Sequence, residues 1–280
     1  MRILCLHGYG TNPEVMKHQM SALLQHCDPS WDFHFLKAQV ESPPAPGVGN
    51  AFPGPYLCWA LDLGTTANKA ASDQIHEVFQ NEGPFDGVFG FSQGASVMLA
   101  YLIEQAARHP GKPLPVRFGV FCSPPPLIAT DQAYINSVYR ALSPEDLHRL
   151  HSGEKDQISQ LPEPVRTAAG MVVENLAAME SVHGKPVSYY TNRPLADIPC
   201  ALHPNLHSAR LSIPTLHVCG TNDPPSMQRC SETSAAFCEP MWRRSFQHSS
   251  THNLPRKPAE AREMVSLMEW VVSKSQQAKM

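Results

Sequence analysis

The chain has 280 residues, 42% of them hydrophobic, and a formal net charge of −3. This length favours one large core, and we expect a single α/β domain over 1–280 that carries an insertion. The charge is close to neutral, which argues against a surface built to bind nucleic acid or an anionic membrane. No run of about 18 apolar residues is present, so the sequence predicts no membrane span.

The cysteines indicate the redox environment in which the protein is expected to function. None of the cysteines form a C-x-x-C pair, which argues against a zinc or disulfide-exchange motif. Cys5, Cys122 and Cys219 lie in apolar segments, as buried free thiols do in a reducing environment. The apolar run at 3–6 is too short for a signal peptide. We expect a cytoplasmic protein with no metal site and no cofactor.

Apolar strand-like segments alternate with longer amphipathic segments along the chain. The predicted strands are 2–6, 33–37, 86–90, 116–122, 214–219 and 243–247. The predicted helices are 12–27, 65–80, 93–108, 226–237 and 258–274. This alternation is typical of a mostly parallel, doubly wound α/β sheet. In the last helix one apolar stripe is expected to pack on the sheet, formed by Ala261, Met264, Val265, Met268 and Val272.

Two segments interrupt the alternation. The segment 41–56 holds five prolines and three glycines, so it predicts a stiff loop rather than a helix or strand. The segment 124–211 is longer than a crossover requires. Its periodicity predicts helices at 131–142, 144–151 and 163–181, with Ser143 as the N-cap of the second. We expect 124–211 to form an inserted helical lid.

A G-x-S-x-G motif at 90–94 follows an apolar strand and precedes a helix, which is the context of a nucleophile elbow. The small residues two before and two after Ser92 allow the sharp turn that exposes its hydroxyl. A serine needs a base to take its proton before it can attack a carbonyl. The motif therefore predicts Ser92 as the nucleophile of a serine hydrolase.

The partners of such a serine follow it in the order acid, then histidine. Asp223 lies just after an apolar strand, at the edge where parallel sheets collect active groups. His252 lies in the loop before the last helix and is the predicted base, with His248 in the same loop as its rival. The predicted triad is Ser92, Asp223 and His252.

The oxyanion hole is expected after the first strand, where the sequence reads His-Gly-Tyr-Gly at 7–10. Glycines there let backbone N–H groups point at a developing oxyanion. The predicted donors are the amides of Tyr9 and of Gln93, the residue after the nucleophile. His7 would brace this loop.

These motifs together resemble one family. The matching segments are 6–12, 90–95, 216–220 before Asp223, His252 with Pro255, and the proline-rich loop followed by Trp59. They are similar to those of the fungal family of small serine hydrolases, to which the ovarian-cancer-associated gene 2 protein and lovastatin-type polyketide-releasing thioesterases are related. The resemblance implies an α/β-hydrolase fold with a Ser92–His252–Asp223 triad. It also implies a role in secondary metabolism, on a small-molecule acyl substrate that a carrier protein can present.

The sequence thus predicts a serine esterase or thioesterase that works through an acyl-enzyme. Trp59, Phe52, Leu127 and Tyr134 are candidates to line an apolar acyl pocket, with core packing as the alternative role. Two other functions stay open. One is acyl transfer or lactone formation, and the other is ligand binding by a protein with an inactive triad.

Overall fold

The computed structural model describes residues 1–140, 142–180 and 184–277. Its main sheet is six-stranded, in the order β2-β1-β5-β6-β7-β8, and every neighbouring pair is parallel. The strands are β1 (Arg2–Leu6), β2 (Asp32–Leu36), β5 (Gly87–Phe91), β6 (Phe118–Cys122), β7 (Thr215–Gly220) and β8 (Arg243–His248). The predicted parallel sheet is confirmed. All six predicted strands are present, with ends that differ by two residues or fewer.

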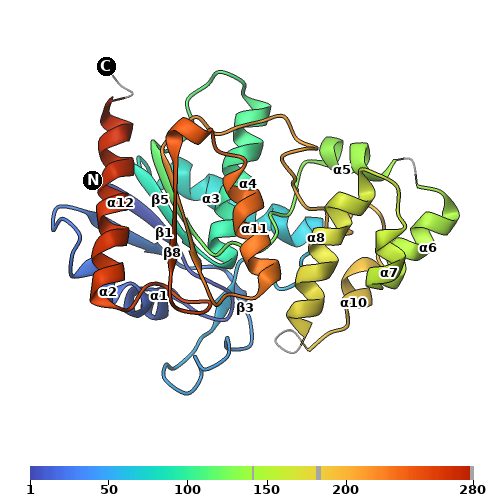
Figure 1. The fold of residues 1–280 in the computed structure, drawn as a ribbon, viewed down its shortest axis with the longest axis horizontal. Helices are drawn as coiled ribbons and strands as arrows, with labels where there is room; N and C mark the ends of the chain where they lie inside the picture. The colour runs from blue at the N-terminus through green and yellow to red at the C-terminus, as the bar shows by residue number, and fades with distance from the viewer. Residues whose placement is uncertain (141, 181–183, 278–280) are drawn as a thin grey trace.

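Helices cover both faces of this sheet (Figure 1). The core helices are α1 (Pro13–Gln19), α2 (Ser21–Leu24), α3 (Thr65–Asn81), α4 (Gln93–Arg108), α11 (Pro225–Ala235) and α12 (Pro258–Gln277), and a 3₁₀ turn spans Pro240–Trp242. The predicted helix 12–27 was wrong as a single element, because it is divided at Met20 into α1 and α2. Asn12 starts α1 by accepting a hydrogen bond from the Val15 amide at 3.0 Å, and Pro13 follows it at the first helical position.

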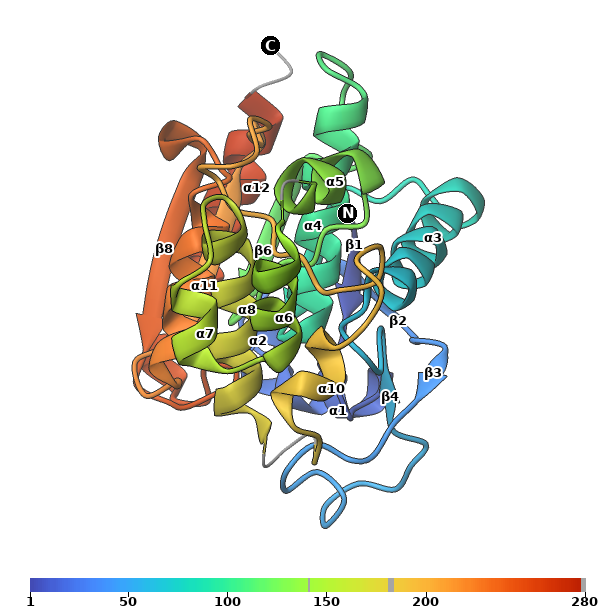
Figure 2. The same cartoon turned by 90° about the vertical axis from the view of Figure 1, so that its right-hand side faces the viewer.

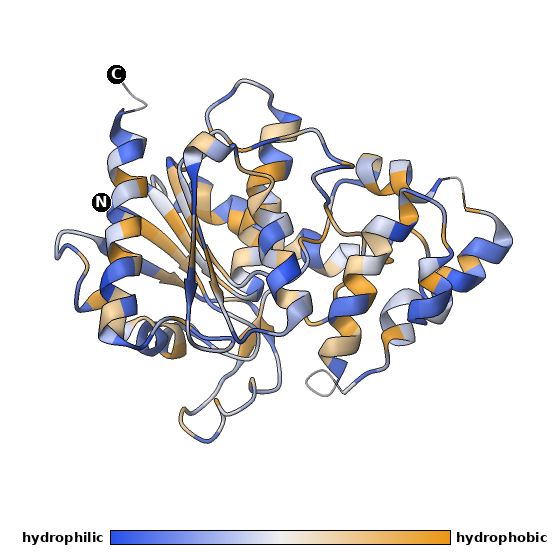
Figure 3. Ribbon diagram, viewed as in Figure 1, coloured by the Kyte–Doolittle hydropathy of each residue, from blue (hydrophilic) through white to orange (hydrophobic). Residues whose placement is uncertain are grey.

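Alternate residues of each strand enter different cores. In β1, Leu4 and Leu6 pack with α3 and α4, whereas Ile3 and Cys5 pack with α2 and α12. The predicted apolar stripe of α12 is buried in the second of these cores. Figure 3 shows the hydrophobic strands between helices whose outer surfaces are hydrophilic. The α/β-hydrolase architecture follows from this doubly covered parallel sheet.

The segment between β6 and β7 forms a group of helices on one side of the sheet (Figures 1 and 2). These are α5 (Gln132–Tyr139), α6 (Pro144–Ser152), α7 (Lys155–Ser159), α8 (Val165–Ala178) and α10 (Val187–Thr191). Ser143 caps α6 as predicted, accepting from the Asp146 amide at 3.1 Å. The short helices α7 and α10 were not predicted. Residues 141 and 181, which the predicted helices 131–142 and 163–181 include, lie outside the described residues.

Buried and exposed ionic groups join this inserted segment to the core. The carboxylate of Glu104, on α4, is buried and accepts hydrogen bonds from the amides of Thr130 at 2.6 Å and Asp131 at 3.0 Å. Arg193 pairs with Asp62 at 3.1 Å, and Arg229 of α11 pairs with Glu174 of α8. The inserted segment is therefore attached near its beginning, middle and end.

The proline-rich segment lies between two short strands, β3 (Val40–Glu41) and β4 (Leu57–Cys58), which pair antiparallel. Between these strands it forms turns and irregular backbone, as predicted. The amide of Ala45 donates to the carbonyl of Gly10 at 2.9 Å, so this loop lies against the segment that follows β1. In the described part of the chain, every helix is too short or too polar to cross a membrane.

Candidate active site

Ser92 lies at the turn between β5 and α4 with φ 51° and ψ −122°, a strained conformation for a residue with a side chain. The turn needs glycine on both sides. A Cβ on Gly90 would lie 2.5 Å from the Cα of Ala95, and one on Gly94 would lie 2.3 Å from the carbonyl oxygen of Leu6. The predicted nucleophile elbow therefore has the expected backbone.

The three predicted triad residues meet at the carboxyl edge of the sheet. The Nε2 atom of His252 lies 2.8 Å from the hydroxyl of Ser92, and its Nδ1 atom lies 3.0 Å from Oδ1 of Asp223. His248, the rival base, ends β8 and is buried, and its Nδ1 atom accepts from the Ser250 amide at 3.3 Å. The structure thus brings His252, and not His248, against the nucleophile.

Asp223 is 3% exposed, and its second oxygen is held by three further donors. Oδ2 accepts from the Ser123 hydroxyl at 2.7 Å, the Gly220 amide at 3.3 Å and the Cys219 thiol at 3.4 Å. Burial alone would raise the pKa of Asp223, but the hydrogen bonds from His252, Ser123 and Cys219 outweigh burial and lower it. Asp223 therefore stays ionised and oriented toward His252.

The sequence did not predict a role for Ser123. It follows β6 directly, is 1% exposed and has φ 45°, which is rare for a residue other than glycine. Its amide donates to the Val218 carbonyl at 2.8 Å, so the strained turn is fixed to β7. In the sequence it is a polar residue at the carboxyl end of a buried strand, just before three prolines, and this pattern does not point to Asp223.

The two predicted oxyanion donors flank the nucleophile. Tyr9 and Gln93 both line the cavity that contains Ser92. Gln93 is the first residue of α4, where a backbone N–H has no acceptor within the helix and the helix dipole favours negative charge. An ideal Cβ on Gly8 would lie 3.3 Å from the Ser92 Cβ, which shows how closely the Gly8–Tyr9 loop approaches the elbow.

His7 braces that loop, as predicted. Its Nε2 atom accepts from the Ala38 amide at 3.3 Å, so Nδ1 carries the proton and donates to the Gly8 carbonyl at 2.8 Å. Thr11 donates to the same carbonyl at 2.7 Å. Burial lowers the pKa of His7 to about 4, so the ring is neutral at physiological pH.

Trp59 connects the two halves of the oxyanion hole. Its indole N–H donates to the His7 carbonyl at 2.8 Å, and its backbone amide donates to the side-chain oxygen of Gln93 at 2.9 Å. The Gln93 side chain completes the link by donating to the Ala60 carbonyl at 2.7 Å. The segment after β4 thus holds the loop after β1 and the start of α4 together.

The site opens into a cavity of about 350 Å³. Besides the triad serine and histidine, it is lined by the loop after β1, α1, the proline-rich loop, α3, α4, α11 and the inserted segment. Lining residues outside the nucleophile elbow and the loop after β1 include Gln19, Ala45, Pro46, Val48, Asn68, Ile128, Asn175, Met179 and Met227.

The four side chains predicted to line an acyl pocket lie elsewhere. Trp59, Leu127 and Tyr134 are core residues, with Tyr134 donating to the Ala201 carbonyl at 3.0 Å. Phe52 lines a separate pocket near α1 and stacks edge-on against the His18 ring at 5.0 Å. The predicted role in lining an acyl pocket is therefore wrong, because none of the four residues lines the Ser92 cavity. Trp59, Leu127 and Tyr134 have the alternative role, core packing.

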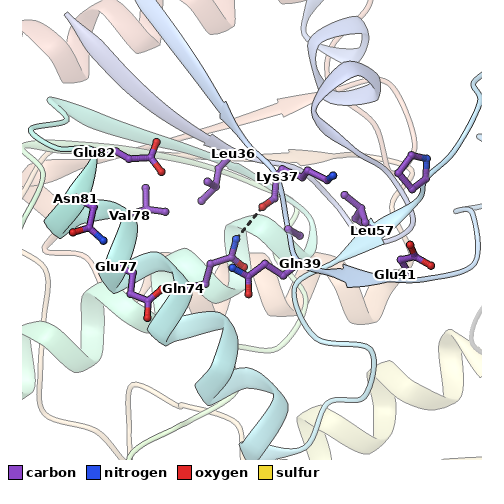
Figure 4. A pocket seen from close by; sticks show the side chains of 12 residues that line it. Leu36, Lys37, Gln39, Glu41, Leu57, Gln74, Glu77, Val78, Asn81 and Glu82 are labelled. Atoms are coloured by element: carbon purple, nitrogen blue, oxygen red, sulfur yellow. Dashed lines mark hydrogen bonds between the residues drawn. The ribbon is translucent and has the colours of Figure 1, made fainter.

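A larger pocket of about 520 Å³ lies beside the edge strand β2, between α3 and the start of the proline-rich segment. Figure 4 shows Glu77, Glu82 and Glu41 around it, together with Lys37, whose carbonyl accepts from Gln74 at 2.9 Å. None of the triad residues lines it.

Comparison with known proteins agrees with this site. A family model described as serine hydrolase (FSH1) matches residues 1–264. The chain is 38% identical to the serine hydrolase cnsH of Penicillium expansum over 232 residues, which cover 82% of this chain and 95% of that protein. It is 30% identical to the esterase alnB of Emericella nidulans and 31% identical to the esterase FPY3 of Fusarium mangiferae, each over 98% of both chains. The match covers most of the chain and includes the nucleophile elbow, with Asp223 and His252 following in the expected order along the chain. The chain therefore belongs to the FSH1 family of serine hydrolases.

Proposed function

We propose that this serine hydrolase cleaves an ester or acyl thioester through an acyl-enzyme on Ser92. The observation that carries the proposal is the continuous hydrogen-bonded chain from Ser92 through His252 to Asp223, at 2.8 and 3.0 Å. Both distances lie within the range that proton transfer requires, without any rearrangement of the site. An inactive ligand-binding protein would not need this chain.

The residues divide the reaction between them. His252 takes the proton of Ser92 as its hydroxyl oxygen attacks the carbonyl carbon, and the negative charge that develops on the substrate oxygen is bound by the amides of Tyr9 and Gln93. Asp223 stabilises the cationic His252. As the tetrahedral intermediate collapses, His252 gives the proton to the departing alcohol or thiol. His252 then takes a proton from a water molecule that attacks the carbonyl carbon of the acyl-enzyme, and it returns this proton to the Ser92 oxygen as the acyl–oxygen bond breaks and the carboxylic acid is released.

The substrate belongs, in this proposal, to secondary metabolism and is polyketide-like, delivered as a small molecule or on a carrier protein. The relatives named above come from fungi, and two of them are esterases. They support a hydrolytic role for this chain. A cavity of about 350 Å³ supports a substrate larger than an acetyl group.

The direct test uses N-acetylcysteamine thioesters and aryl esters with acyl chains of two to about ten carbons. The wild type is expected to hydrolyse members of both series, and Ser92→Ala is expected to lower kcat/KM by about 10⁴-fold or more. Equal melting temperatures of the two proteins would show that the variant is folded. Hydrolysis by Ser92→Ala at the wild-type rate would contradict the proposal.

A further inference from the structure

The Ser92 cavity is built without charged side chains. In the described part of the chain, no Asp, Glu, Lys or Arg contributes to its wall, although helices and loops from widely separated parts of the chain form this wall. Its ionisable side chains are Tyr9 and the catalytic His252. An anionic or cationic substituent bound here would lose its hydration without gaining a partner of opposite charge.

The wall nevertheless offers buried hydrogen-bonding groups. Asn175 of α8 is 4% exposed, and its amide donates to the thioether sulfur of Met227 at 3.0 Å. A thioether is a weak acceptor, so a buried amide donor is poorly satisfied by it. A carbonyl or hydroxyl oxygen of a bound molecule would be a stronger acceptor for the same N–H group.

A second side-chain amide lines the same cavity. Gln19, the last residue of α1, lines the cavity beside Val48 of the proline-rich loop, and its side-chain oxygen is buried without a hydrogen-bond partner among the described residues. Buried polar groups in folded proteins are nearly always paired, directly or through water. Asn175 and Gln19 thus place neutral hydrogen-bonding groups on an otherwise mostly apolar wall.

We propose that the cavity selects an uncharged acyl group that carries an oxygen function of its own, a ketone or hydroxyl, which Asn175 binds. Acyl groups with a terminal carboxylate are rejected because their charge stays unpaired. This inference rests on the proposed function, since it concerns the substrate of the same Ser92 site. It places Asn175 among the residues that determine specificity, with no part in the chemical steps.

The test compares matched thioesters of N-acetylcysteamine on the wild-type protein. Six-carbon acyl groups that are unsubstituted, that carry a ketone at C3, C4 or C5, or that end in a carboxylate differ little in size. We expect kcat/KM for the thioester that ends in a carboxylate (the half-acid) to be about 100-fold below that of the hexanoyl thioester. At least one keto thioester is expected to exceed hexanoyl by about fivefold.

The acetyl thioester distinguishes a failure of this inference from a failure of the proposed function, because it reaches Ser92 without filling the cavity. If acetyl is hydrolysed but the half-acid reacts within threefold of hexanoyl, or no keto thioester exceeds hexanoyl, this inference is wrong and the proposed function stands. If no thioester in the series, acetyl included, and no aryl ester of the same acyl groups is hydrolysed, both are wrong.

Two variants test whether Asn175 causes the preference for the keto thioester. Asn175→Leu removes the amide and keeps a side chain of similar size, so it should abolish the preference: the keto and hexanoyl thioesters should then react with equal kcat/KM. Met227→Leu removes the thioether acceptor and leaves the Asn175 donor, so the keto preference should be kept or increased. Equal keto preference in wild type and Asn175→Leu would overturn the role of Asn175.

Discussion

At the scale of single residues, Ser123 helps to orient Asp223 and to keep it ionised. It donates to the Asp223 oxygen that His252 does not contact, at 2.7 Å, and both side chains are buried. Hydrogen bonds to a charged group contribute about 1.5–3 kcal/mol. Ser123 acts through Asp223 and touches no substrate, so it is a positioning residue.

Replacing Ser123 by alanine tests this role. The loss of the donor should raise the pKa of Asp223, because fewer hydrogen bonds then favour its charged form, and should lower kcat by about tenfold or more with little change in KM. The variant's rate should also fall off at a higher pH than that of the wild type on the acid side of the profile. Cys219→Ala, which removes a weaker donor to the same oxygen, is the control and should have a smaller effect. Identical pH profiles for wild type and Ser123→Ala would contradict the role.

The triad could be predicted from the sequence, whereas Ser123 could not. Ser92 is marked by a local motif whose glycines are required by contacts of 2.5 Å and less. Asp223 and His252 follow from their order and from their places after a strand and before a helix. Ser123 lies 100 residues from Asp223 and has no motif of its own, so its role becomes visible only when β6 and β7 are seen as neighbours.

At the scale of elements, the segment after β4 determines the shape of the oxyanion hole. Trp59 was predicted to line an acyl pocket, but its indole N–H binds the carbonyl of His7 in the oxyanion loop. A sequence does not distinguish these roles, because an apolar ring after a proline-rich loop is compatible with either one. The distinction depends on a contact between residues 52 positions apart.

Trp59→Phe removes the indole donor and keeps an aromatic ring. We expect kcat to fall by about tenfold, since a displaced oxyanion donor weakens transition-state binding, with KM changed by less than threefold. Inhibition by a trifluoromethyl ketone, which forms an anionic tetrahedral adduct, should weaken in parallel with kcat. Phe52→Leu is the matched control and should leave both quantities unchanged, because Phe52 lies outside the Ser92 cavity. A change in KM alone would contradict this role of Trp59.

At the scale of the whole molecule, the parallel sheet and its two apolar cores could be predicted from alternating strand and helix patterns. The wall of the cavity could not. It joins α8 of the inserted segment to α11 and α1 to the proline-rich loop, and these contacts between distant parts of the chain leave no periodic signal. The helices α7 and α10 escaped prediction because they have five residues each, too few for a helical period to be recognised.

Two buried histidines make stability depend on pH. Burial lowers the pKa of His7 to about 4 and that of His217 to about 3, whereas both titrate near 6.5 in an unfolded chain. Between pH 6.5 and 4 the unfolded chain therefore binds protons that the folded chain does not. The free energy of unfolding should be greatest above pH 6.5 and should fall by about 1.4 kcal/mol per pH unit for each group below it.

Urea denaturation at pH 7.5, 6.0, 5.0 and 4.5 measures this dependence. His217→Leu removes one of the two titrating groups and keeps an apolar side chain next to Phe121, so its curve should be shallower than that of the wild type. Parallel curves for the two proteins would show that His217 is not held neutral by the fold.

The central claim is that the acyl group is carried by Ser92, and a fluorophosphonate probe followed by peptide mass spectrometry tests it most directly. The probe is expected to add to the peptide that contains Ser92, to react much more slowly with His252→Ala, and to leave Ser92→Ala unlabelled. Labelling of a different residue in the wild type, or undiminished labelling of Ser92→Ala, would contradict the account.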